Sequence, residues 1–114
     1  MTGCVYIVGG GPGDCDLLTV KAYRLLQRAE AVVYDRLVSG DVLALAPKGA
    51  MRVFAGKSCK SHAMPQDEIN HTLLALAKKK KTVVRLKGGD PFIFGRGGEE
   101  AEFLTNHRIP FEII

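Results

Sequence analysis

The sequence contains no tryptophan, only three cysteines and no long apolar run. Cys4, Cys15 and Cys59 are odd in number and form no CxxC pair, which indicates free thiols in a reducing cytosol. Cys59 and His62 have the spacing of half a zinc site, but no second pair follows, so we expect no metal. No stretch approaches the ~18 apolar residues of a membrane span, and the N-terminus does not resemble a signal peptide. These absences favour a cytoplasmic protein without a membrane partner.

The composition is that of one globular domain. The chain has 114 residues, of which 46% are hydrophobic and 25% are charged, and its net charge is +4. This charge suits an anionic ligand and is too modest to indicate nucleic acid. The most basic stretch, residues 78–81, lies at the expected end of a helix, where cations favour the negative end of the helix dipole.

Apolar β-branched runs alternate along the chain with segments of helical periodicity. We expect five strands, at Cys4–Val8, Ala31–Tyr34, Arg52–Ala55, Thr82–Leu86 and Pro110–Ile114. We expect helices at Leu17–Arg28, at Gly40–Ala46, from Pro65 onward and at Glu99–His107. This order predicts an α/β fold with a five-stranded, mostly parallel sheet and helices on both faces.

Three unusual segments follow predicted strands. They are Gly9–Asp14, Tyr34–Val38 and Lys87–Arg96, and the last belongs to RLKGGDPFIFGRGGEE, in which five of sixteen residues are glycine. In a parallel sheet these segments share the carboxyl edge, where ligands bind. The structural alternatives are a tight βα turn, a turn-capping aspartate at Asp35 and a glycine-rich connector.

The first segment nearly matches a dinucleotide-binding fingerprint. VGGGPGD precedes a predicted helix, and Asp35 ends the next strand 22 residues after Gly13. However, Asp14 stands where the third glycine of GxGxxG belongs, and Pro12 removes a backbone donor that a phosphate would use. A nucleotide-binding module therefore remains only an alternative.

Taken together, VGGGPGDCDLLTVKA, VVYDRLVS and VVRLKGGDPFIFGRGGEE resemble the amino-terminal half of the uroporphyrinogen-III C-methyltransferase family, which are tetrapyrrole methylases. The resemblance covers essentially the whole chain. It implies methylation of uroporphyrinogen III to precorrin-2, via precorrin-1, in sirohaem and cobalamin biosynthesis. The implied cofactor is S-adenosyl-L-methionine, which becomes S-adenosyl-L-homocysteine.

The resemblance also implies roles for individual residues. It makes Asp35 the proton acceptor and Lys57 the proton donor, with a surface lysine as the alternative reading of Lys57. The residues that match cofactor-lining positions are Pro12, Gly88, Gly89, Asp90 and Ile93. Because the implied substrate carries many carboxylates, cations are expected near it. The candidates by position and charge are Arg36, Lys60, Arg85 and Arg96, with His62 near the substrate.

The resemblance further implies a parent with two domains, usually a homodimer, of which residues 1–114 are the amino-terminal domain and from which the second domain is absent. The isolated domain is then expected to be weakly active or inactive. The other alternative is a non-catalytic binding or dimerisation fragment.

Overall fold

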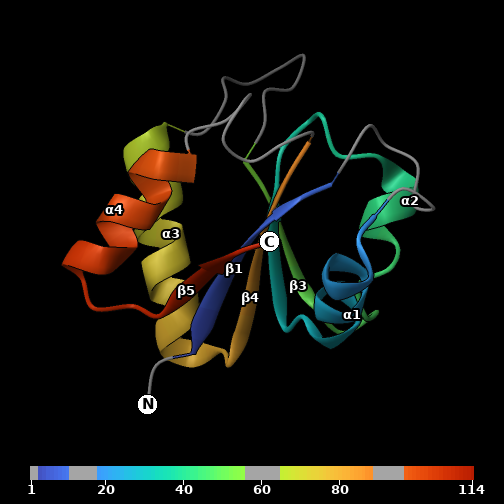
Figure 1. Cartoon of the computed structure of the whole chain (residues 1–114), viewed down its shortest axis with the longest axis horizontal. Coiled ribbons are helices and arrows are strands. Elements are labelled where there is room, and N and C mark those ends of the chain that lie inside the picture. Colours follow the sequence, from blue (N-terminus) through green and yellow to red (C-terminus); the bar gives the residue numbers. More distant parts are fainter. Residues whose placement is uncertain (1–2, 11–17, 56–64, 89–96) are drawn as a thin grey trace.

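The computed structural model describes residues 3–10, 18–55, 65–88 and 97–114. Within these ranges, nine elements follow one another in sequence (Figure 1). The strands are β1 (Cys4–Gly9), β2 (Ala31–Tyr34), β3 (Met51–Phe54), β4 (Thr82–Lys87) and β5 (Phe111–Ile113). The helices are α1 (Val20–Arg28), α2 (Gly40–Leu43), α3 (Gln66–Lys79) and α4 (Gly97–Asn106). Every predicted strand and helix is present.

The five strands form one sheet in the order β3-β2-β4-β1-β5, and all four pairings are parallel. The sheet therefore confirms the predicted α/β class. The central strand β4 pairs with β1 on one side and with β2 on the other. It is buried along almost its whole length, as expected for a strand covered on both faces.

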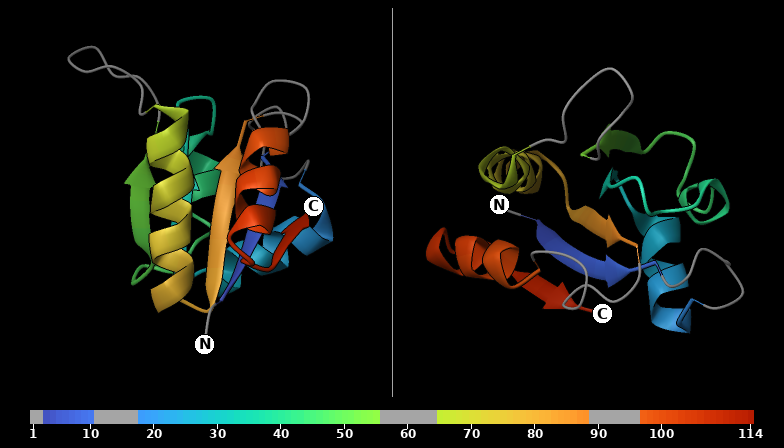
Figure 2. Two further views of the ribbon diagram at one scale, coloured as in Figure 1. Left: turned by 90° about the vertical axis from the view of Figure 1, so that its left-hand side faces the viewer. Right: turned by 90° about the horizontal axis from the view of Figure 1, so that it is seen from above.

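The helices divide evenly between the two faces, as Figure 2 shows from above. One apolar core joins α1 and α2 to one face of the sheet, and the other joins α3 and α4 to the opposite face. Alternation along the strands sets this division, because successive side chains point to opposite faces. The predicted helical stripes supply both cores: Ala22, Leu25, Leu26 and Ala29 on one side, and Ile69, Leu73, Leu76 and Ala77 on the other.

Polar caps explain where the helices begin. The Thr19 side chain accepts a hydrogen bond from the Ala22 amide at 3.1 Å, so α1 begins at Val20. Ser39 caps α2 in the same way, and this helix ends at Leu43, earlier than predicted. Pro65 is the N-cap of α3, so this helix begins one residue after the predicted first-turn proline. In the part of the chain that the structure describes, no helix has the length and apolar character needed to cross a bilayer.

The turn from α4 to β5 contains a residue in the left-handed region. Arg108 has φ of 58°. The Ile109 amide donates to the Leu104 carbonyl at 2.9 Å, and the Arg108 amide donates to the Thr105 carbonyl at 3.1 Å. This is the Schellman arrangement, in which glycine usually occupies the position that Arg108 holds.

We expect Arg108→Gly to stabilise the chain by about 0.5–1 kcal/mol, because glycine adopts this conformation without the steric cost of a Cβ. Urea unfolding followed by circular dichroism measures the change. Arg108→Ala is the matched control, since alanine also lacks the guanidinium but keeps the Cβ. Equal stabilities for the two variants contradict the prediction.

Candidate functional site

A candidate ligand site lies at the carboxyl edge of the sheet. Here the chain leaves two neighbouring parallel strands toward opposite faces of the sheet. The adjacent strands β1 and β4 both point toward this edge. The chain continues from β1 to α1 on one face and from β4 to α4 on the other (Figures 1 and 2). Open α/β sheets usually bind their ligands at such a switch point.

The described ends of the three predicted segments meet at this edge. The Gly10 amide donates to the Lys87 carbonyl at 2.5 Å, which joins the end of β1 to the end of β4. Gly88 lies against the segment after β2: a Cβ on Gly88 would be 2.3 Å from the Leu37 Cβ. The absence of a side chain at Gly88 therefore allows two loops to pack together.

Asp35 is half-buried directly after β2. Its Oδ1 accepts a hydrogen bond from the Leu37 amide at 2.9 Å, and its carbonyl accepts one from the Val38 amide at 3.3 Å. The carboxylate thus shapes its own turn, as the structural alternative expected. Tyr34 is in register with Leu86, so Asp35 follows beside Lys87 at the carboxyl edge.

Lys87, the last residue of β4, is buried under this edge with 3% of its surface exposed. Its Nζ lies 3.2 Å from Oε1 of Glu100. Burial lowers the pKa of the Lys87 ammonium below its ordinary value, because a low-dielectric surrounding disfavours the charged form. The negative charges of Glu100 and Asp35 act in the opposite direction and favour the ammonium.

Arg85 lies two residues earlier on the same face of β4 and is 4% exposed. Its Nε binds Oε2 of Glu100 at 3.0 Å, and its Nη1 donates to the Val33 and Leu86 carbonyls, each at 3.4 Å. The guanidinium is therefore enclosed and already paired. This contradicts the expectation that Arg85 binds a substrate carboxylate, whereas Arg36 is exposed beside Asp35.

Glu100 is the acceptor for both buried cations and has no exposed surface. It lies in the first turn of α4 and also accepts from Nε2 of Gln66, at 3.2 Å. Gln66 in turn donates to Oδ1 of Asn70 at 2.9 Å. No motif or resemblance in the sequence pointed to Glu100. The available signal was the alternation of Arg85 and Lys87 with apolar residues in a central strand, which requires a buried anion.

Most of the predicted site lies outside the described residues. These positions are Pro12, Lys57, Gly89, Asp90 and Ile93, together with Lys60, His62 and Arg96. Of the proposed catalytic and cofactor positions, the structure describes Asp35 and Gly88 and brings both to the same edge. Of the candidate cations, it describes Arg36 and Arg85. Among the described residues, no group of three or more His, Cys, Asp or Glu could hold a metal ion.

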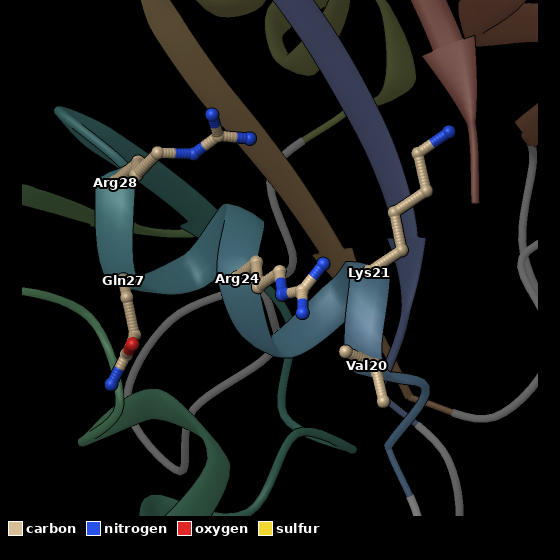
Figure 3. Close-up of a pocket in the computed structure, with 5 residues that line it drawn as sticks. All are labelled: Val20, Lys21, Arg24, Gln27 and Arg28. Carbon is tan, nitrogen blue, oxygen red and sulfur yellow. The ribbon is translucent and has the colours of Figure 1, made fainter.

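A separate open pocket of about 750 Å³ lies along α1 (Figure 3). Its lining residues are Val20, Lys21, Arg24, Gln27 and Arg28. Lys21 also forms an ion pair with Glu112 of β5. None of the predicted site residues lines this pocket, so it is distinct from the carboxyl-edge site.

The parallel sheet with helices on both faces and a switch point between β1 and β4 defines a doubly wound α/β domain. Within this class, the chain belongs to the Tetrapyrrole (Corrin/Porphyrin) Methylases, whose family model matches residues 4–114. The sequence is 58% identical over 113 residues to a siroheme synthase of Saccharophagus degradans. It is 60% identical over 113 residues to a siroheme synthase of Pseudomonas fluorescens. These matches cover 99% of this chain but only 25% and 24% of the two relatives.

Solved structures agree with this assignment. The native form of uroporphyrin III C-methyl transferase from Thermus thermophilus is 55% identical, with a TM-score of 0.86, and the match covers 98% of this chain and 48% of that one. The same enzyme complexed with S-adenyl homocysteine is 54% identical, with a TM-score of 0.84, over 98% of this chain and 44% of that one. The chain thus spans about a quarter of these curated relatives and less than half of these solved chains.

Proposed function

We propose that this chain is the amino-terminal domain of an S-adenosyl-L-methionine-dependent methyltransferase that converts uroporphyrinogen III to precorrin-2 via precorrin-1. This reaction belongs to sirohaem and cobalamin biosynthesis. The observation that carries the proposal is the convergence of three segments at the switch point in a chain of the tetrapyrrole methylase family. We further propose a cytoplasmic location and a full-length parent that is a homodimer.

The described part of the carboxyl edge suits a cationic methyl donor. It presents the backbone of Gly10 and Gly88 and the carboxylate of Asp35. The buried cations Arg85 and Lys87 are neutralised in part by Glu100. In the proposal, a ligand sulfonium at this edge meets the carboxylate of Asp35, whose negative charge favours positive charge.

When bound, S-adenosyl-L-methionine supplies a methyl group on an already activated leaving group, so the protein has to orient the reactants and exclude water. In the proposal, Pro12, Gly88, Gly89, Asp90 and Ile93 hold the cofactor. Asp35 accepts the proton that leaves the methylated tetrapyrrole, and Lys57 donates the proton that the macrocycle regains. In the proposal, Arg36, which is exposed, meets a substrate carboxylate.

Isothermal titration calorimetry of the 114-residue chain tests the cofactor assignment. We expect S-adenosyl-L-homocysteine to bind, weakly because the 114 residues match less than half of the solved chains, and NADH not to bind. Stoichiometric NADH binding without S-adenosyl-L-homocysteine binding would instead support a nucleotide-binding module.

Transfer of a labelled methyl group to uroporphyrinogen III tests the catalytic assignment. Product from the wild-type chain argues against a purely binding or dimerisation fragment. In a preparation that forms product, Asp35→Asn is expected to reduce the rate about 10²–10⁴-fold, the usual contribution of a general base. An unchanged rate argues against Asp35 as the proton acceptor.

A further inference from the structure

The carboxylate of Glu100 joins three elements beneath the carboxyl edge. Oε2 accepts from Arg85 at 3.0 Å and from Gln66 at 3.2 Å, while Oε1 faces Lys87 at 3.2 Å. These contacts connect α4 to β4 and to the start of α3. The cation-bearing side chains and Glu100 are all at least nine-tenths buried. The cluster is therefore a fixed internal junction, because surface ion pairs of this kind would be weak and mobile.

The residues of this junction lie at the ends of the elements that flank most of the proposed site positions. Lys87 ends β4, and Glu100 is in the first turn of α4, so their ion pair joins the end of β4 to the start of α4. Gln66 begins α3. Glu100 therefore links the end of β4 and the starts of α3 and α4, and the sequence positions between these elements carry most of the proposed site.

Asp35 also contributes to the charge balance of this cluster. Two buried cations face one carboxylate, so Glu100 alone leaves one positive charge without an equal counter-charge. Asp35 follows beside Lys87 in the sheet register, and its charge favours the Lys87 ammonium. Charge-assisted hydrogen bonds are directional, so the cluster fixes orientation as well as contact. Apolar residues of similar volume would stabilise the fold without that directionality.

We propose that Glu100 is a positioning residue for cofactor binding, whose carboxylate fixes the end of β4 and the starts of α3 and α4 relative to one another and to Asp35. The inference rests on the proposed function, since that function assigns sequence positions between these elements to the cofactor site. It adds a residue that touches neither cofactor nor substrate and acts through Arg85, Lys87 and Gln66.

Glu100→Gln tests the proposal, because it keeps the side-chain shape and removes the charge. Glu102→Gln is the matched control: it removes the same charge from an exposed position on the same helix. We expect the dissociation constant for S-adenosyl-L-homocysteine, measured by calorimetry on protein that circular dichroism shows to be folded, to rise at least about tenfold in Glu100→Gln. Glu102→Gln should bind like wild type. Equal affinity in the two variants overturns the proposal.

A triple variant separates positioning from stability. Arg85→Met, Lys87→Met and Glu100→Leu together replace the cluster by apolar residues of similar volume, which buried ion-pair clusters often tolerate. This variant also decides the matter if Glu100→Gln does not fold. We expect it to fold and to bind S-adenosyl-L-homocysteine at least about tenfold more weakly than wild type. A folded triple variant with wild-type affinity overturns the proposal.

Hydrogen exchange without ligand tests the positioning role of Glu100 independently of cofactor binding. If the wild-type chain fails to bind S-adenosyl-L-homocysteine, the cofactor assignment is in error for this chain. The positioning claim is then tested in α4. Glu100→Gln should accelerate exchange of the hydrogen-bonded α4 amides that follow its first turn, relative to Glu102→Gln, with β1 unchanged. Identical exchange in both variants overturns the positioning claim.

Discussion

Gly88→Ala is expected to lower the free energy of unfolding by about 3 kcal/mol, at the upper end of the usual cost of overpacking. A Cβ at this position would be 2.3 Å from the Leu37 Cβ and 2.9 Å from both the carbonyl carbon and the carbonyl oxygen of Leu37. Two of these three atoms belong to the backbone, so rotation of a side chain cannot relieve the overlap. The segment after β2 must instead move away from the end of β4.

Urea unfolding measures this cost, and Gly49→Ala is its matched control. A Cβ at Gly49 meets nothing within 4 Å, so this substitution should stay within about 0.5 kcal/mol of wild type. A double variant with Leu37→Gly removes the nearest contact and should recover part of the stability. The interaction energy from this double-mutant cycle then measures the contact directly. Equal stabilities of Gly88→Ala and Gly49→Ala contradict the close packing of the two loops.

The same substitution has a consequence for the site. Asp35 and Leu37 belong to one turn, in which the Leu37 amide donates to the Asp35 carboxylate. Displacing Leu37 therefore displaces the proposed proton acceptor. Calorimetry should show weaker S-adenosyl-L-homocysteine binding in Gly88→Ala than in Gly49→Ala, on protein that remains folded.

Gly88 illustrates what a sequence conveys about a glycine and what it leaves open. The family resemblance assigned Gly88 to the positions that line the cofactor. In the structure, a Cβ at Gly88 would collide with Leu37, a residue of the same chain. A glycine signals space for a close contact, but the identity of the contact depends on which loops the sheet brings together.

The sheet order is the main feature of the fold that local patterns did not provide. Periodicity located all nine elements and the buried stripes of α1 and α3, because it depends only on neighbours in the sequence. The order β3-β2-β4-β1-β5 depends instead on pairing between strands far apart, such as β1 with β4. The switch point between these two strands, and hence the place of the candidate site, follows from that order.

The position of Glu100 in the first turn of α4 explains only part of its role. Glu99 and Glu100 both lie in the first turn of α4, where acids favour the positive end of the helix dipole. The structure separates them, since Glu99 is exposed and Glu100 is fully buried. The distinguishing signal is the spacing of Glu100 from Leu104, four residues on, which places it on the buried stripe of the helix.

Arg85→Met is expected to destabilise the chain by about 3 kcal/mol, the usual order of cost when one partner of a buried ion pair is removed. The variant loses the Nε contact to Glu100 and the two contacts of Nη1 to the Val33 and Leu86 carbonyls. Lys87 still pairs with Glu100, so the carboxylate keeps one cation and the cost stays at the lower end of the range. Urea unfolding followed by circular dichroism measures the difference.

Arg36→Met is the matched control, because it removes the same group from an exposed position at the same edge of the sheet. Surface substitutions of this kind usually change stability by no more than about 0.5 kcal/mol. The pair of variants therefore separates two roles that residue type alone could not distinguish. An arginine that meets the substrate from solvent can be removed without unfolding the chain, whereas the structure makes Arg85 part of the core beneath the site. Equal stabilities for Arg85→Met and Arg36→Met would contradict that placement and return Arg85 to the substrate-binding cations.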